Sequence, residues 1–145
     1  MRTRFILALL ILLLACALQF WFASAGVFVN FILAALVVFA FFFDVWELVV
    51  FVLAAVLIVN WAPAIGLDII VFALIPLAAF IFHKTFAFAP WIAMPASIVA
   101  GFAVLYLAIA PASFGARVGL FGTDVLGGLV FAALVFATLE RLGRA

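Results

Sequence analysis

The apolar residues of the chain fall into six blocks, and nearly every charged residue lies in a gap between two blocks. The blocks cover residues 5–25, 27–43, 45–62, 68–82, 88–110 and 122–139. All but the fourth reach the roughly 17 to 25 residues that an α-helix needs to cross the hydrocarbon layer of a bilayer. The pattern therefore predicts an all-α protein, a polytopic integral membrane bundle of six transmembrane helices in a single domain, residues 1–145.

The fourth block is the shortest, and Pro76 interrupts it, so a re-entrant segment is the alternative to a full crossing there. The distribution of basic residues decides between six crossings and five. With six crossings and a cytoplasmic N-terminus, only Arg117 lies outside, and the basic residues inside are Arg2, Arg4, Lys84, Arg141 and Arg144. Five crossings would move the last two outside, so we expect six, with both termini in the cytoplasm.

Composition supports the membrane assignment, since 75% of the residues are hydrophobic and 8% are charged, against about 25% charged in soluble domains. A net charge of +1 gives no field that would attract nucleic acid. Cys16 and His83 are the only residues of their types, so neither a disulfide nor a protein-only zinc site is expected. Cys16 follows a basic start as a lipoprotein cysteine would, but the apolar run continues past it, which favours a buried helical cysteine.

Most acidic residues stand where a helix is expected to begin. Asp44 and Glu47 have the spacing of a capping box, while Asp68 opens the fourth block and Asp124 opens the sixth, where the helix dipole favours negative charge. No ionisable residue then lies in the middle of a span, which disfavours the proton relays and ion sites of pumps. Because the chain also lacks a Ser-His-Asp arrangement and paired carboxylates within spans, we expect no catalytic residue, no cofactor, no metal and no enzymatic activity.

Five polar residues share a depth near the outer ends of the expected helices. They are Gln19, Asn30, Asn60, Asp68 and Asp124. One interpretation is a shallow polar pocket open to the outside. The other is hydrogen bonding of the amides between helices, and the sequence alone favours this second interpretation.

Small residues recur every fourth position in the last two blocks and allow helix backbones to approach closely. The positions are Ala89, Ala93, Ser97 and Gly101 in the fifth block, and Gly128 and Ala132 in the sixth. They predict helix-packing interfaces, either within the fold or against a partner protein in the membrane.

With its segments placed in this way, the chain resembles the rod shape-determining MreD family of bacterial inner-membrane proteins. The similarity lies in Leu18-Gln19, in Gly26-Val-Phe-Val-Asn30-Phe-Ile-Leu33, in Asn60 through Gly66-Leu67, and in a final helix ending in Arg141 and Arg144. Asn60 stands where the family has an acidic residue. The resemblance implies a multi-pass scaffold of the bacterial inner membrane that contacts other integral membrane proteins in cell-shape and peptidoglycan synthesis.

The same broad fold is similar to that of the S-components of energy-coupling-factor transporters, which bind vitamins. That likeness implies a ligand pocket, for which the outer polar residues would serve. We therefore expect a non-enzymatic membrane protein acting through helix-helix contacts, with the substrate-binding subunit of a small-molecule transporter as the alternative.

Overall fold

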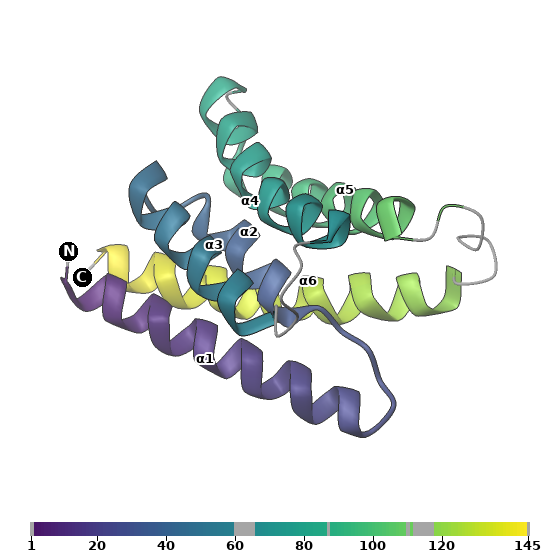
Figure 1. Ribbon diagram of the computed structural model, residues 1–145. Helices are drawn as coiled ribbons and strands as arrows, with labels where there is room; N and C mark the ends of the chain where they lie inside the picture. The colour runs from purple at the N-terminus through teal and green to yellow at the C-terminus, as the bar shows by residue number, and fades with distance from the viewer. Residues whose placement is uncertain (1, 60–65, 87, 110, 112–117, 145) are drawn as a thin grey trace.

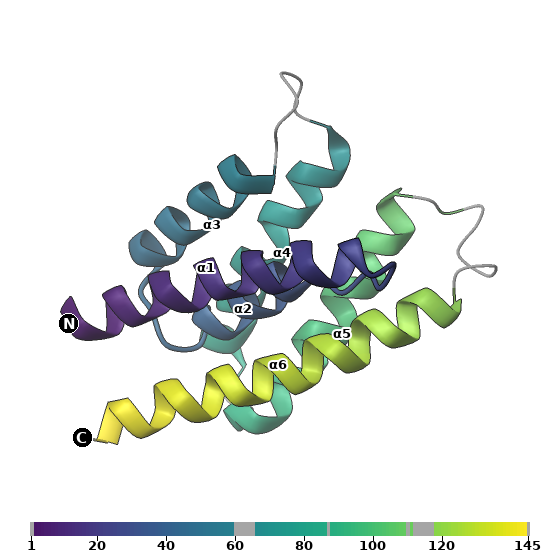
Figure 2. The same ribbon diagram turned by 90° about the horizontal axis from the view of Figure 1, so that it is seen from below.

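The computed structural model describes residues 2–59, 66–86, 88–109, 111 and 118–144, which form an all-α bundle (Figure 1). Its helices are α1 (Arg2–Ser24), α2 (Phe31–Phe39), α3 (Val45–Val59), α4 (Leu67–Thr85), α5 (Pro90–Ile109) and α6 (Val118–Arg144). None of the described residues is in a strand, and the all-α prediction is confirmed. The start of α1 and the end of α6 lie at the same end of the bundle in both views (Figures 1 and 2).

Four helices, α1, α4, α5 and α6, are long and apolar enough to cross a membrane. Their outward faces carry exposed large apolar side chains such as Leu13, Leu74 and Leu134, which suits contact with lipid. The fourth block, expected to be the short one, forms a helix of 19 residues with Pro76 in its interior. The short helices are instead α3, with 15 residues, and α2, with 9.

Helix α2 is the centre of the bundle. All nine of its residues are buried, and it packs against each of the other helices. Nine residues span only about 14 Å, half the thickness of a hydrocarbon layer. The prediction of one continuous helix over 27–43 is therefore wrong, because residues 27–30 precede α2 without helical structure and residues 40–43 turn away after it.

The chain leaves α1 through a tight turn at Gly26, which has a φ of 78°. The N–H groups of Gly26 and Val27 donate to the carbonyls of Ala23 and Phe22 at 3.0 Å, the two bonds of a Schellman motif. A positive φ favours glycine here because it has no Cβ. The turn lies in the one-residue gap between the first two apolar blocks.

The acidic residues predicted to start two other helices do so. Glu47 accepts a hydrogen bond from the N–H of Asp44 at 3.3 Å, which is the reciprocal half of a capping box before α3. Asp68 lies in the first turn of α4. The sequence was sufficient to predict these two helix starts because each depends on residues within one helical turn.

Helix α6 begins at Val118, earlier than the predicted start at Gly122. Gly119, which lies in the gap before the sixth apolar block, is thus inside the first turn of the helix. Asp124 is consequently almost two turns inside the helix rather than at its start. An ionisable residue therefore lies inside this candidate span, near its beginning rather than in its middle.

The predicted small-residue interface lies mostly within the fold, where Ala93, Gly101, Gly128 and Ala132 are buried. A Cβ on Gly101 would lie 2.5 Å from Cγ2 of Ile75 in α4. A Cβ on Gly128 would lie 2.7 Å from Cε2 of Phe102 in α5. The glycines thus allow close packing of α4 on α5 and of α5 on α6, while Ser97 is half-buried beside a groove between α4 and α5.

Aromatic side chains fill the bundle near the end that carries the termini. The ring of Phe51 in α3 lies 4.8 Å from that of Phe5, 5.0 Å from Phe39 and 5.2 Å from Phe43, measured between centroids. These contacts join α1, α2 and α3. These four phenylalanines thus pack together at this end of the protein.

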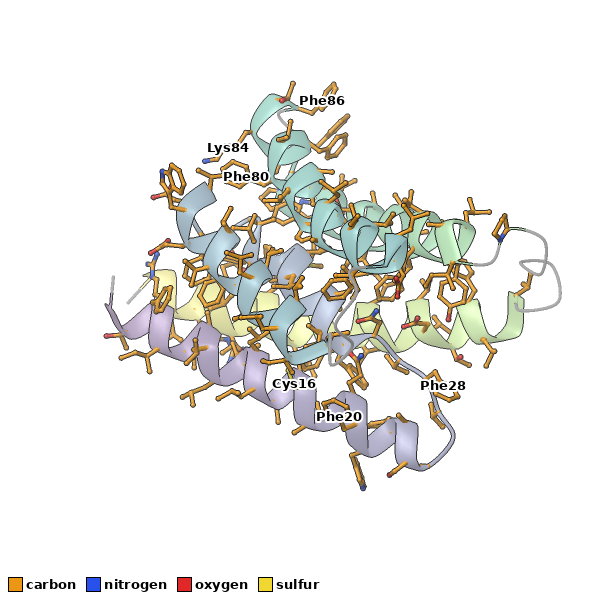
Figure 3. The ribbon with its side chains drawn as sticks, in the orientation of Figure 1. Cys16, Phe20, Phe28, Phe80, Lys84 and Phe86 are labelled. Atoms are coloured by element: carbon orange, nitrogen blue, oxygen red, sulfur yellow. The ribbon has the colours of Figure 1, made fainter. Side chains whose placement is uncertain are left out.

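Basic residues mark the same end. Lys84 lies in the last turn of α4, and its Nζ lies 5.6 Å from the centroid of the Phe80 ring (Figure 3). Arg4 lies in the first turn of α1, and Arg141 lies near the end of α6. Arg117, the basic residue expected on the opposite side, lies outside the described residues.

Two glycines of α6 have different surroundings, so replacing each with alanine should have opposite effects on the free energy of unfolding. Gly128→Ala should lower the free energy of unfolding by about 1–3 kcal/mol, because the buried Phe102 ring must shift. Gly122→Ala should raise it by about 0.5–1 kcal/mol, because a Cβ there has no neighbour within 4 Å and alanine favours the helix. Thermal unfolding of the purified protein in detergent measures both, and equal effects would contradict the packing described for α5 and α6.

Candidate functional site

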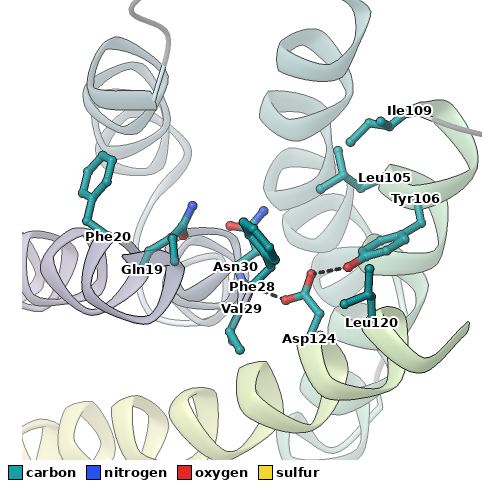
Figure 4. Close-up of a pocket in the computed structure, with 11 residues that line it drawn as sticks. Gln19, Phe20, Phe28, Val29, Asn30, Leu105, Tyr106, Ile109, Leu120 and Asp124 are labelled. Carbon is teal, nitrogen blue, oxygen red and sulfur yellow. Dashed lines mark hydrogen bonds between the residues drawn. The ribbon is translucent and has the colours of Figure 1, made fainter. Parts of the chain in front are cut away.

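A cavity of about 480 Å³ lies at the end of the bundle opposite the termini. Figure 4 shows the residues that line it. The last turns of α1 and α5, the first turns of α6 and residues 28–30 surround it. The cavity exists because α2 begins only at Phe31, so that no helix occupies the centre of the bundle at this end. The polar residues on its wall are Gln19, Asn30, Tyr106 and Asp124.

The start of α2 is held by acceptors from three parts of the chain. The N–H of Asn30 donates to Oδ1 of Asp124 at 2.6 Å, and the N–H of Ile32 donates to Oε1 of Gln19 at 3.2 Å. The N–H of Leu33 donates to Oδ1 of Asn30 itself at 3.1 Å. Side chains thus satisfy backbone donors that a helix leaves free at its start, which matters most where water is scarce.

Asp124 is the one buried charged residue in the described part of the chain, with 5% of its surface exposed. Its Oδ2 accepts a hydrogen bond from the hydroxyl of Tyr106 at 3.1 Å, and Figure 4 shows these side chains pointing toward one another from α6 and α5. Its carboxylate therefore lies at the positive end of the α2 dipole. Asp124 does cap a helix, as its residue type indicated, but the helix is α2 rather than its own.

A smaller cavity of about 120 Å³ adjoins the first. The two share Gln19, Asn30, Leu105 and Ile109, and the smaller one adds the exposed Asp68 at the start of α4. Each of the two neighbouring cavities is therefore bordered by one aspartate, Asp124 in the larger and Asp68 in the smaller.

The structure thus brings together most of the polar residues that the sequence placed at one depth. Gln19, Asn30 and Asp124 line the larger cavity, and Asp68 lines the smaller one. Asn60 lies outside the described residues. Pocket formation and hydrogen bonding between helices, considered as alternatives, involve the same side chains here.

Sequence reasoning missed Tyr106. It is the only tyrosine in the chain, and it lies one turn before the end of the fifth apolar block, at the depth of the other polar residues. A tyrosine hydroxyl within an apolar segment usually has a hydrogen-bond partner, so its position was an available signal.

The candidate metal ligands do not converge in the described part of the chain. No group of three histidine, cysteine, aspartate or glutamate side chains there is placed to hold a metal ion. Cys16 is buried in the middle of α1, and the His83 ring packs 4.6 Å from the Phe41 ring at the other end of the bundle.

The chain matches no protein-family model, no curated protein and no solved structure. The geometry of the cavity is therefore the basis for a functional proposal.

The hydrogen bonds of Asp124 predict a graded effect of its substitution. Asp124→Ala should lower the free energy of unfolding by about 1–3 kcal/mol, because the Asn30 N–H loses its acceptor in an apolar site. Asp124→Asn should cost less, because its amide oxygen can still accept that bond. Thermal unfolding measures both variants, and hydrogen exchange at the Asn30 amide locates the effect.

Thr123→Ala is the matched control on the preceding residue, since Thr123 is exposed and its hydroxyl donates only within α6, to the carbonyl of Leu120. Its unfolding temperature should stay close to that of the wild type. Equal losses for Thr123→Ala and Asp124→Ala would show that Asp124 does not hold the start of α2.

Proposed function

We propose that the chain is a non-enzymatic, multi-pass membrane protein that binds a small solute in the cavity between Gln19, Asn30, Tyr106 and Asp124. The observation that carries the proposal is the cavity itself, whose volume of about 480 Å³ lies within the ~300–1,000 Å³ typical of small-molecule sites. Its wall is mainly apolar with a few convergent polar groups, which is also typical. Polar residues that served only to join helices would be packed closely, without a hollow of this size.

The fold supports a topology in which the cavity opens on the extracytoplasmic side. Arg4, Lys84 and Arg141 lie at the end of the bundle with the termini, and the positive-inside rule places that end in the cytoplasm. Six passes then result if residues 27–30 and α2 together complete the second one. Non-helical backbone within a membrane is tolerated where it lines a cavity, as residues 28–30 do.

A solute site of this kind suits the substrate-binding subunit of a transporter, the alternative that the S-component likeness implied. The scaffold role implied by the MreD resemblance remains a prediction. It has less support, because Ala93, Gly101, Gly128 and Ala132 are buried within the chain, and a partner helix would need another surface. The bacterial inner membrane is the location that either resemblance implies.

Blocking the cavity should abolish solute binding. Ala23 lines the cavity near the end of α1, whereas Ala17 is exposed on α1 and does not line it. A thermal-shift screen of neutral, cationic and anionic compounds should find at least one that stabilises the wild type and Ala17→Phe but not Ala23→Phe. At a concentration 100 times the Kd, the gain in unfolding free energy is about 2.7 kcal/mol.

The absence of any such compound would contradict the proposed function. So would stabilisation that Ala23→Phe retains in full, since the compound would then bind elsewhere. A scaffold has no need of a solute, so this screen also separates the two roles.

The topology predicts where reporter fusions are active. Fusions after Lys84 and after Arg144 should both report a cytoplasmic location, because both positions follow an even number of passes. Alkaline phosphatase and green fluorescent protein fusions give opposite signals on the two sides of a membrane. A periplasmic C-terminus would refute the six-pass arrangement.

A further inference from the structure

We propose that the solute is an organic cation, a protonated amine on a small apolar body, with Asp124 as its counter-ion. The inference rests on the proposed function, because it names the class of ligand for the same cavity. Three observations support it: the incompletely compensated charge of Asp124, the absence of basic side chains on the described cavity walls, and the aromatic character of those walls.

The charge of Asp124 is only partly compensated within the fold. Among the described residues, the hydrogen-bond donors to its carboxylate are the Asn30 N–H and the Tyr106 hydroxyl, and both are neutral. The start of α2 contributes the equivalent of about half a positive charge. A carboxylate has about four acceptor positions, and these two bonds leave capacity for a further donor from a ligand.

The described residues around the two cavities include two aspartates and no lysine, arginine or histidine. Arg141, the first basic residue after Asp124 on α6, lies about 26 Å away along the helix at 1.5 Å per residue. An anionic solute would therefore be repelled by Asp124 and Asp68 across a medium of low dielectric constant. A cationic solute would instead be attracted to these two carboxylates.

The rest of the wall suits a cation that has an apolar body and is larger than a metal ion. Phe20, Phe28 and Tyr106 line the cavity, and aromatic faces attract ammonium groups. Figure 3 shows Phe20 and Phe28 near the turn that follows α1. A hard metal ion needs several oxygen ligands, and the described carboxylates offer no group of three to hold one.

The test compares three probes of similar shape and different charge: phenethylamine, 2-phenylethanol and phenylacetate. Their binding to the purified wild-type protein in detergent is measured by calorimetry at pH 7. Phenethylamine should bind at least about tenfold more tightly than the neutral alcohol, and phenylacetate should bind most weakly. Ala23→Phe should abolish the binding of phenethylamine, while Ala17→Phe should leave it unchanged.

The Asp124→Asn variant tests whether the preference for the cationic probe depends on the Asp124 carboxylate. Its affinity for phenethylamine should fall about tenfold, to the level of the alcohol, while its affinity for 2-phenylethanol changes less than about twofold. Asp68→Asn is the matched control at the same end of the bundle, and its exposed carboxylate should matter less than Asp124. If Asp124→Asn does not fold, the ranking of the three probes on the wild type decides the question.

Equal affinities for the three probes, or tighter binding of phenylacetate, would overturn the inference. The proposed function would still stand if Ala23→Phe abolishes the binding of the probe in question. The same holds if none of the three probes binds and a neutral or anionic compound from the screen occupies the cavity. If no compound of any charge binds in a manner that Ala23→Phe abolishes, the proposed function fails as well.

Discussion

The start of α2 is the constraint on which the rest of the structure depends. A helix that begins inside an apolar bundle has free N–H groups, and leaving them unpaired away from water costs several kcal/mol. Gln19 from α1 and Asp124 from α6 supply acceptors across the bundle, and Asn30 supplies one from within the segment. Because these bonds join helices from both ends of the chain, they set how α1, α2 and α6 lie relative to one another.

The same short helix divides the bundle into a filled end and a hollow end. Near the termini, α2 and the rings of Phe5, Phe39, Phe43 and Phe51 occupy the centre. Beyond the first turn of α2, the longer helices α1, α5 and α6 continue without it and enclose the cavity. A hollow closed at one end suits binding from one side of a membrane better than a continuous channel.

The same polar atoms contribute to the stability of the fold and to the proposed function. Asp124 holds the α2 backbone and also faces the cavity, so its carboxylate contributes both to stability and to the charge that a solute would meet. The small residues, by contrast, belong to packing: Gly101 admits Ile75, and Gly128 admits Phe102. The long helices carry exposed apolar side chains on their outward faces, while the buried charge of the described residues, Asp124, lies at the cavity.

The block pattern alone determined the all-α class, the turn at Gly26, the starts of α3 and α4, and the common depth of Gln19, Asn30, Asp68 and Asp124. These features depend on composition or on residues within a turn of one another, which a linear pattern records. Only the tertiary structure decided the short length of α2, the early start of α6 and the pairing of Asp124 with Tyr106. Gly119 and Gly122 are helical despite their low propensity. The bond from Asn30 to Asp124 joins residues 94 positions apart, so contacts between distant segments determined what a local pattern could not.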